Sequence, residues 1–137
     1  MTLKYSVIFI AALAAGCGGG GGDDGGGNGG PPTGPGGGGN PPVATTTITI
    51  TSAGVSPSRI TVPPGSRVTF INSDSRSHEM TSDPHPDHGD CPPIDQVGFL
   101  TPGQSKQTGN LTVTRTCGYH DHNLPDTASL RGEIIVQ

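Results

Sequence analysis

The sequence predicts an all-β fold, an antiparallel β-sandwich or barrel, over residues 43–137. Short runs of β-branched and aromatic residues recur along this region, and turns rich in Pro and Gly separate them. No stretch of ten residues shows the 3.6-residue periodicity of an amphipathic helix. The region is long enough for one domain and too short for two.

The strands are expected where apolar and polar residues alternate. The first run, Thr45–Thr51, is β-branched at every position, which is typical of a strand. The other runs end in turns or loops; they are 59–62, 67–72, 98–100, 105–108, 111–117 and 132–136. Between them, 73–97 reads as one long loop with four prolines, three histidines and a cysteine. So long a loop is uncommon in a compact domain unless it carries function.

Composition excludes several classes of function. The formal net charge is −4 and there are only 7 Lys and Arg residues, which argues against nucleic acid as a partner. No nucleotide-binding loop, Ser-His-Asp order or paired-carboxylate pattern stands out, so we do not expect an enzyme. With no Trp, 2 Tyr and 3 Phe, the core should be thin and built from Val, Ile and Leu. We also expect the chain to be a monomer.

Residues 1–17 resemble a bacterial lipoprotein signal. The single cation Lys4 precedes an apolar run too short to span a bilayer, which ends in Leu13-Ala14-Ala15-Gly16-Cys17. The resemblance implies cleavage before Cys17 and lipidation of its thiol. It places the protein in the bacterial cell envelope, on the periplasmic side or at the outer membrane, and attached to the membrane by lipid. An ordinary secretory signal is the alternative.

Residues 18–42 hold most of the 24 glycines of the chain, with Pro, Asp, Asn and Thr between them. Such a segment cannot bury enough apolar surface to offset its ordering entropy. We expect a disordered Gly/Pro-rich tether between the anchor and the domain.

Metal-binding side chains gather near the end of the predicted strand 111–117. Cys117, His120 and His122 lie within six residues, and His78 follows the earlier strand 67–72. Thiolate and imidazole are the ligands that copper and zinc select, whereas calcium and magnesium prefer oxygen. The pattern therefore predicts a copper or zinc site.

In this region the sequence resembles the cupredoxins, the small blue copper proteins of the plastocyanin and pseudoazurin type. The resemblance rests on five segments in order: 60–70, Asn72-Ser73-Asp74 before His78, 101–105, Cys117-Gly118-Tyr119-His120 and 132–136. It implies a Greek-key β-sandwich and one copper ion bound by His78, Cys117 and His120. It also implies one-electron transfer to an unknown redox partner protein.

Two features depart from the family pattern. Leu130 stands where the family usually has an axial methionine, so Met80 or His122 is a possible additional ligand. Asn72 or Asp74 is expected to orient His78, and Asp121 to orient His120.

Cys91 is the second departure, because a Cys91–Cys117 disulfide would remove the thiolate. The site would then contain nitrogen only, from His78, His120 and His122, with His85 or His88 as further candidates. Otherwise His85 and His88 are expected to be solvated loop residues. The disulfide leaves two alternative functions open, a copper storage or delivery module and a metal-free structural module.

Overall fold

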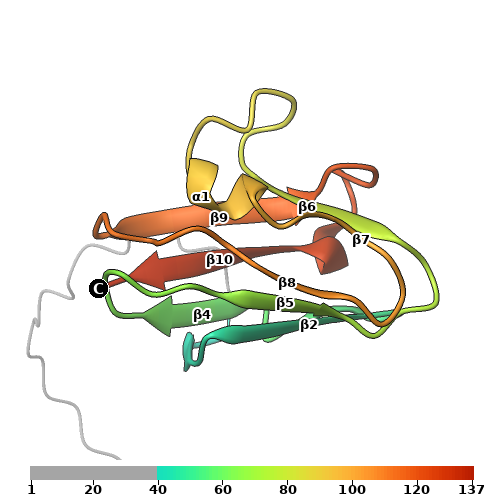
Figure 1. Ribbon diagram of the computed structural model, residues 1–137, viewed down its shortest axis with the longest axis horizontal. Coiled ribbons are helices and arrows are strands. Elements are labelled where there is room, and N and C mark those ends of the chain that lie inside the picture. The colour runs from blue at the N-terminus through green and yellow to red at the C-terminus, as the bar shows by residue number, and fades with distance from the viewer. Residues whose placement is uncertain (1–39) are drawn as a thin grey trace, which may run out of the picture. The chain divides into compact units, whose positions relative to one another are not determined.

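Two facing β-sheets make up the domain in the computed structural model, which describes residues 40–137 (Figure 1). The predicted signal 1–17 and residues 18–39 of the predicted tether lie outside the described residues. In the described part, no helix is long and apolar enough to cross a membrane.

Ten strands and two short helices follow one another along the chain. The strands are β1 (Val43–Ala44), β2 (Thr47–Thr51), β3 (Gly54–Ser56), β4 (Arg59–Val62), β5 (Thr69–Asn72), β6 (His78–Ser82), β7 (Gly98–Leu100), β8 (Ser105–Gln107), β9 (Arg115–Asp121) and β10 (Arg131–Val136). The helices are α1 (Pro92–Asp95) and the 3-10 helix η1 (Ala128–Leu130).

The larger sheet has the order β1-β4-β10-β9-β6-β7 and the smaller one β3-β2-β5-β8. The sandwich prediction is confirmed. The pairing is mixed: β1–β4, β4–β10 and β2–β5 are parallel, and the other pairs are antiparallel.

Alternate side chains of each strand fill the space between the sheets. Ile48 and Ile50 of β2 are fully buried, and one aromatic pair, Phe70 and Tyr119, meets edge to face at 5.2 Å between ring centroids. The ring of Tyr119 fits because Gly132 opposite it has no side chain; a Cβ there would collide with the Tyr119 hydroxyl. The core is aliphatic with few aromatic rings, as the composition predicts.

Two of the differences from the sequence prediction bear on the site. The expected loop 73–97 contains β6 and α1, and the strand expected at 111–117 instead runs from Arg115 to Asp121. It extends this far because β10 pairs with it on one side and β6 on the other. In an extended strand, residues an odd number apart point to opposite faces of the sheet. Cys117 and His120 are three residues apart, so they face away from each other.

Candidate metal centre

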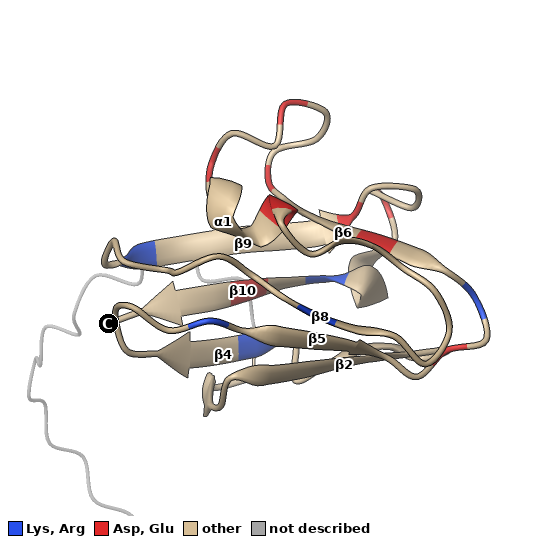
Figure 2. Ribbon diagram, viewed as in Figure 1, with Lys and Arg blue, Asp and Glu red and all other residues tan. Residues whose placement is uncertain are grey.

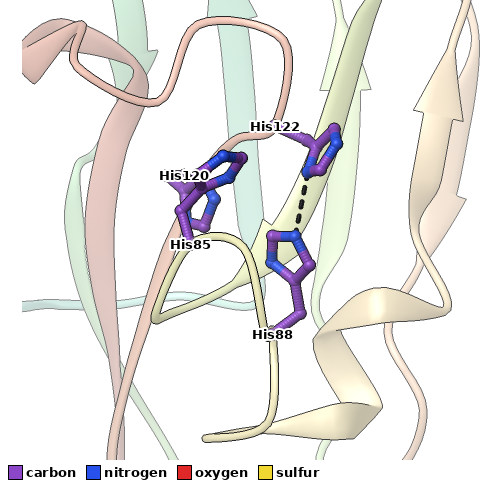
Figure 3. Close-up of side chains that lie close together, drawn as sticks. All are labelled: His85, His88, His120 and His122. Carbon is purple, nitrogen blue, oxygen red and sulfur yellow. Dashed lines mark hydrogen bonds between the residues drawn. The ribbon is translucent and has the colours of Figure 1, made fainter.

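Four histidines converge on the face of the larger sheet that points away from the smaller one. His85 and His88 come from the loop after β6, His120 from β9, and His122 from the residues just beyond it (Figure 3). One ring nitrogen from each lies within 4.8 Å of the corresponding nitrogens of the others. We call this group the four-histidine cluster.

The antiparallel pairing of β6 with β9 brings these segments together. The loop after β6 is closed at its base, where the Asp90 amide donates to the Asp83 carbonyl at 3.0 Å. The Asp83 amide in turn donates to the carbonyl of Gly118 in β9 at 3.0 Å. His122 is fixed by its amide, which donates to the Glu79 carbonyl at 2.7 Å. Both pairs of histidines are therefore held on hydrogen-bonded backbone.

Hydrogen bonds on the outer side of two rings direct their other nitrogen into the cluster. His120 Nδ1 lies 2.7 Å from Asp83 Oδ1, and His88 Nδ1 donates to the Ser82 carbonyl at 2.9 Å. In each ring this leaves Nε2 as the nitrogen with a lone pair. A carboxylate or carbonyl behind the ring is the usual way in which proteins orient a metal-binding histidine.

The inner nitrogen of His120 has no partner among the described residues. His120 is 1% exposed, and its Nε2 is buried without any hydrogen bond. Buried polar atoms are nearly always paired, so an unpaired one requires an explanation. A metal ion bound at this nitrogen would supply the missing partner.

His88 holds a backbone conformation that residues with a side chain seldom adopt, with φ at 50°. Two bonds to Ser82 hold it there, one from the His88 ring and one from the Ser82 hydroxyl to the His88 carbonyl at 2.7 Å. Such backbone strain persists where surrounding contacts fix it, and it clusters at functional sites.

His85 completes the cluster from the solvent side. It is exposed, and its ring centroid lies 5.0 to 5.6 Å from those of His122, His120 and His88. The pKa of His85 is lowered, first by loss of water around its charged form and then by repulsion from the three neighbouring rings. The neutral form, which binds metal, is therefore favoured.

The spacing of the cluster suits a metal ion with nitrogen ligands. At a metal–nitrogen distance of about 2 Å, a square plane separates adjacent nitrogens by about 2.8 Å and opposite ones by about 4 Å. His122 Nδ1 and His88 Nε2 are 2.9 Å apart, and all four nitrogens fit within 4.8 Å. Small ring movements would close the set around one ion.

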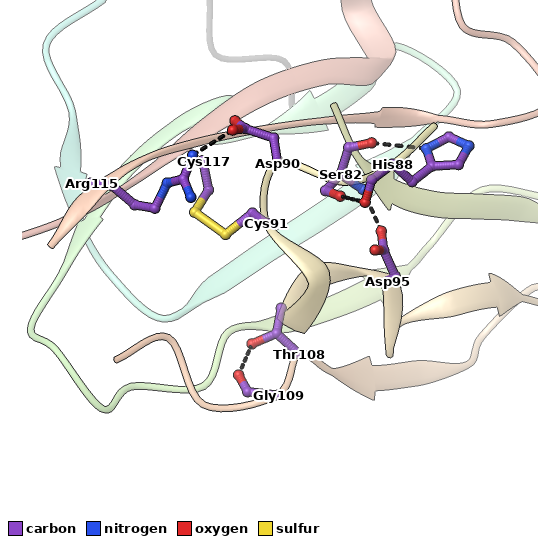
Figure 4. The surroundings of a disulfide bond; sticks show 9 residues. All are labelled: Ser82, His88, Asp90, Cys91, Asp95, Thr108, Gly109, Arg115 and Cys117. Atoms are coloured by element: carbon purple, nitrogen blue, oxygen red, sulfur yellow. Dashed lines mark hydrogen bonds and ion pairs between the residues drawn. A yellow bond between two sulfur atoms is a disulfide. The ribbon is translucent and has the colours of Figure 1, made fainter. Parts of the chain in front are cut away.

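The structure corrects the prediction that Cys117 is a thiolate ligand, because Cys117 forms a disulfide with Cys91 (Figure 4). The two Cα atoms are 5.7 Å apart, within the range of disulfides. Cys91 stands directly before α1, at the end of the loop that carries His85 and His88. The structure thus contains the disulfide of the alternative prediction, and the candidate site offers nitrogen ligands alone.

His78 is also placed away from the cluster, which corrects its role in both predicted ligand sets. Its Nδ1 lies 2.7 Å from Asp121 Oδ2 and its Nε2 3.1 Å from Asp74 Oδ2, and all three side chains are buried. Each ring nitrogen of His78 thus lies within hydrogen-bonding distance of a buried carboxylate oxygen, so both nitrogens already have protein partners away from the cluster. We call this group the His78 clamp.

The residues expected to orient the histidines, and those expected as additional ligands, have the following contacts in the structure. Asp74 and Asp121 both bind His78, Asn72 donates to the carbonyls of Arg76 and Leu100, and Asp83 takes the role at His120. Met80 and Leu130 lie in the hydrophobic core, whereas His122 joins the cluster as predicted.

The sequence reasoning undervalued His85 and His88. The signal was their spacing, His85-Pro86-Asp87-His88, two imidazoles three residues apart in a segment that ends at Cys91. Because the disulfide joins Cys91 to Cys117, it brings the segment with His85 and His88 beside the strand that leads to His120 and His122.

The sequence matches no protein-family model and no curated protein. Solved structures do match. A purple cupredoxin from Nitrosopumilus maritimus has a TM-score of 0.53 at 19% identity, covering 68% of this chain and 100% of its own. An amicyanin mutant in the reduced state has 0.52 at 18%, covering 66% and 80%. Oxidised plastocyanin from Dryopteris crassirhizoma has 0.52 at 17%, covering 66% and 99%. With its two-sheet sandwich and these neighbours, the chain has the cupredoxin fold.

Proposed function

We propose that the protein binds one copper ion, as Cu(II), through the imidazoles of His85, His88, His120 and His122. The observation that carries this proposal is the buried, unpartnered Nε2 of His120 in a set of four converging nitrogens. Copper is the ion of choice because nitrogen sites bind Cu(II) more tightly than the other divalent metals of its row. The cupredoxin fold of the domain, shared with known copper proteins, supports the same ion.

The disulfide decides which copper function we propose. Without a thiolate the site lacks the ligand that gives blue copper its intense colour and its easy change of oxidation state. Four imidazoles on a preformed scaffold favour tight retention of Cu(II). We infer a storage or delivery module, which is not an enzyme and in which metal affinity is the selected property.

One-electron transfer is the second candidate. Structural neighbours are described in oxidised and reduced states, which favours a redox role for the fold. Voltammetry of the copper-loaded protein separates the two functions: a carrier gives a fast, reversible one-electron wave, and a storage module a slow or irreversible one. Neither is expected to show strong red absorption.

We also propose that the domain is attached to the bacterial cell envelope through lipid on Cys17. The disulfide supports an oxidising compartment, because such bonds seldom persist in the cytoplasm. Labelling with a radioactive fatty acid should mark the wild-type protein and not Cys17→Ala. Equal labelling of both would refute the anchor.

Copper titration tests the main proposal. We expect one Cu(II) per chain, with the electron paramagnetic resonance pattern of four nitrogen ligands. His120→Ala should weaken binding by at least about 100-fold, more than is typical for loss of an outer partner. Asn123→Ala, one residue beyond His122 and outside the cluster, is the matched control and should bind like wild type.

Circular dichroism and thermal unfolding establish that each variant folds. Absence of stoichiometric copper in the folded wild-type protein would refute the proposal. Full retention of copper by His120→Ala would place the site elsewhere.

A further inference from the structure

A pocket of ≈ 570 Å³ adjoins the four-histidine cluster. Its walls include His85 and His120 of the cluster, Asp83 and Asp126, and Arg131 at the start of β10. His85 is exposed on the pocket side, whereas the inner nitrogen of His120 is buried behind the other rings. The pocket is thus a route by which a small solute could reach an ion in the cluster, past His85.

Arg131 is placed to act on such a solute. Among the residues that line the pocket it is the only Lys or Arg. Its side chain is 51% exposed, and Nη2 lies 3.7 Å from the Asp83 oxygen that also contacts His120. This separation is longer than a direct hydrogen bond, so the guanidinium keeps donors for another partner.

A divalent ion in the cluster would change the charge balance of the pocket. Without the ion, Asp83 and Asp126 outnumber Arg131, so the lining is negative and attracts cations. Figure 2 shows further acidic residues on the loops of this end of the sandwich. The two charges of a bound ion would outweigh the excess of one carboxylate among the lining residues, which would favour the entry of an anion into the loaded pocket.

The four histidines would hold the ion through one nitrogen each, and the ion would offer a positive centre to which a further small ligand could bind. We propose that the pocket admits a small inorganic anion, which would bind the metal as an added ligand beside Arg131. The inference rests on the proposed copper site. It adds a ligand class that the storage function alone does not require.

Azide is the probe, added to the copper-loaded domain. We expect a new charge-transfer band and a changed electron paramagnetic resonance spectrum, both saturating with azide. Arg131→Met should weaken azide binding roughly three- to fivefold, as fits a half-exposed charge, and Arg131→Lys should recover part of the loss. Arg67→Met removes the same charge far from the pocket and should leave azide affinity unchanged.

The outcomes separate the two proposals. If copper binds and azide produces no spectral change at high concentration, the anion pocket is refuted and the copper site stands. Equal azide affinity for Arg131→Met and wild type would refute the role of Arg131. If no copper binds, both proposals fail. The metal-free protein should bind no azide in any case.

Discussion

The five histidines of the chain occupy two environments on opposite faces of one sheet. On the inner face, the His78 clamp engages both nitrogens of one imidazole with carboxylates. On the outer face, one nitrogen from each of four imidazoles converges, and the rings of His120 and His88 have an oxygen partner on their other nitrogen. The comparison teaches that burial alone does not make a histidine a metal ligand. The two environments differ in whether a ring nitrogen is left without a protein partner, as Nε2 of His120 is and both nitrogens of His78 are not.

Strand β9 supplies both environments through simple alternation. Tyr119 and Asp121 point into the sandwich, and His120 between them points out. A variant on the inner face should therefore change fold stability and leave copper binding intact, and a variant on the outer face should do the reverse.

The largest effect should come from His78→Asn. It removes the imidazole that lies 2.7 Å from Asp121 Oδ2 and leaves this buried carboxylate without that partner, and loss of one member of a buried pair of this kind costs about 3–5 kcal/mol. We expect a fall of this size in the free energy of unfolding, measured by urea denaturation. Copper stoichiometry below the unfolding transition should remain one per chain. Loss of copper from the folded variant would show that the two faces are coupled.

The disulfide joins the two regions, so its removal should affect both. The double variant Cys91→Ala/Cys117→Ala frees a segment with a sequence separation of 26. Chain entropy predicts a loss of roughly 3–4 kcal/mol in unfolding free energy. Because the loop with His85 and His88 loses one fixed end, copper affinity should also fall, by about tenfold. Calorimetry with Zn(II) as well as Cu(II) checks the second effect without redox chemistry.

Unchanged metal affinity in the folded double variant would mean that hydrogen bonds alone position the loop. Those bonds include the ion pair between Asp90 and Arg115 beside the disulfide (Figure 4).

A smaller effect, confined to the outer face, should follow from Gly118→Ala. A Cβ at this position would collide with the Asp83 carboxylate, which orients His120. Displacing such a partner typically weakens metal binding 10–100-fold, and we expect about tenfold. Gly89→Ala in the same loop is the control, because a Cβ there meets nothing within 4 Å. Equal copper affinity in both variants would exclude the role of Asp83.

The smallest effect concerns acid stability on the inner face. Burial alone would raise the pKa of Asp74, but hydrogen bonds from His78, Arg76 and the Ser75 amide lower it to about 2, from 3.8. A lowered pKa stabilises the fold fully above about pH 4, and this contribution is lost as pH falls towards 2. Asp74→Asn should therefore flatten the pH dependence of the urea midpoint between pH 4 and 2. On acidification, copper should leave the protein before this range is reached, because imidazoles gain protons at a higher pH than carboxylates do.

The sequence predicted the sandwich and several strands because β-branched alternation and Pro-Gly turns are local signals. Strands β4 and β7 have the expected bounds. It could not predict that β9 continues through Gly118, because that extension depends on partners from β6 and β10.

The same limit explains the site. Spacing placed Cys117, His120 and His122 together, but the face on which each side chain lies depends on where the strand ends. The sequence left open whether Cys117 is a thiolate ligand or pairs with Cys91, and only the three-dimensional structure decides between these alternatives. Asp83 gave no local signal at all, because it acts on a residue 37 positions away.

The alternation along β9 has a practical consequence for protein engineering. The nitrogen donors of the outer face sit on a loop and at the end of β9, and their side chains lie outside the hydrophobic core. Exchanging one imidazole there for a cysteine or a carboxylate would retune the preferred ion, while the interior supports the new chemistry unaltered. The ion specificity of the domain could therefore be changed while its fold is kept.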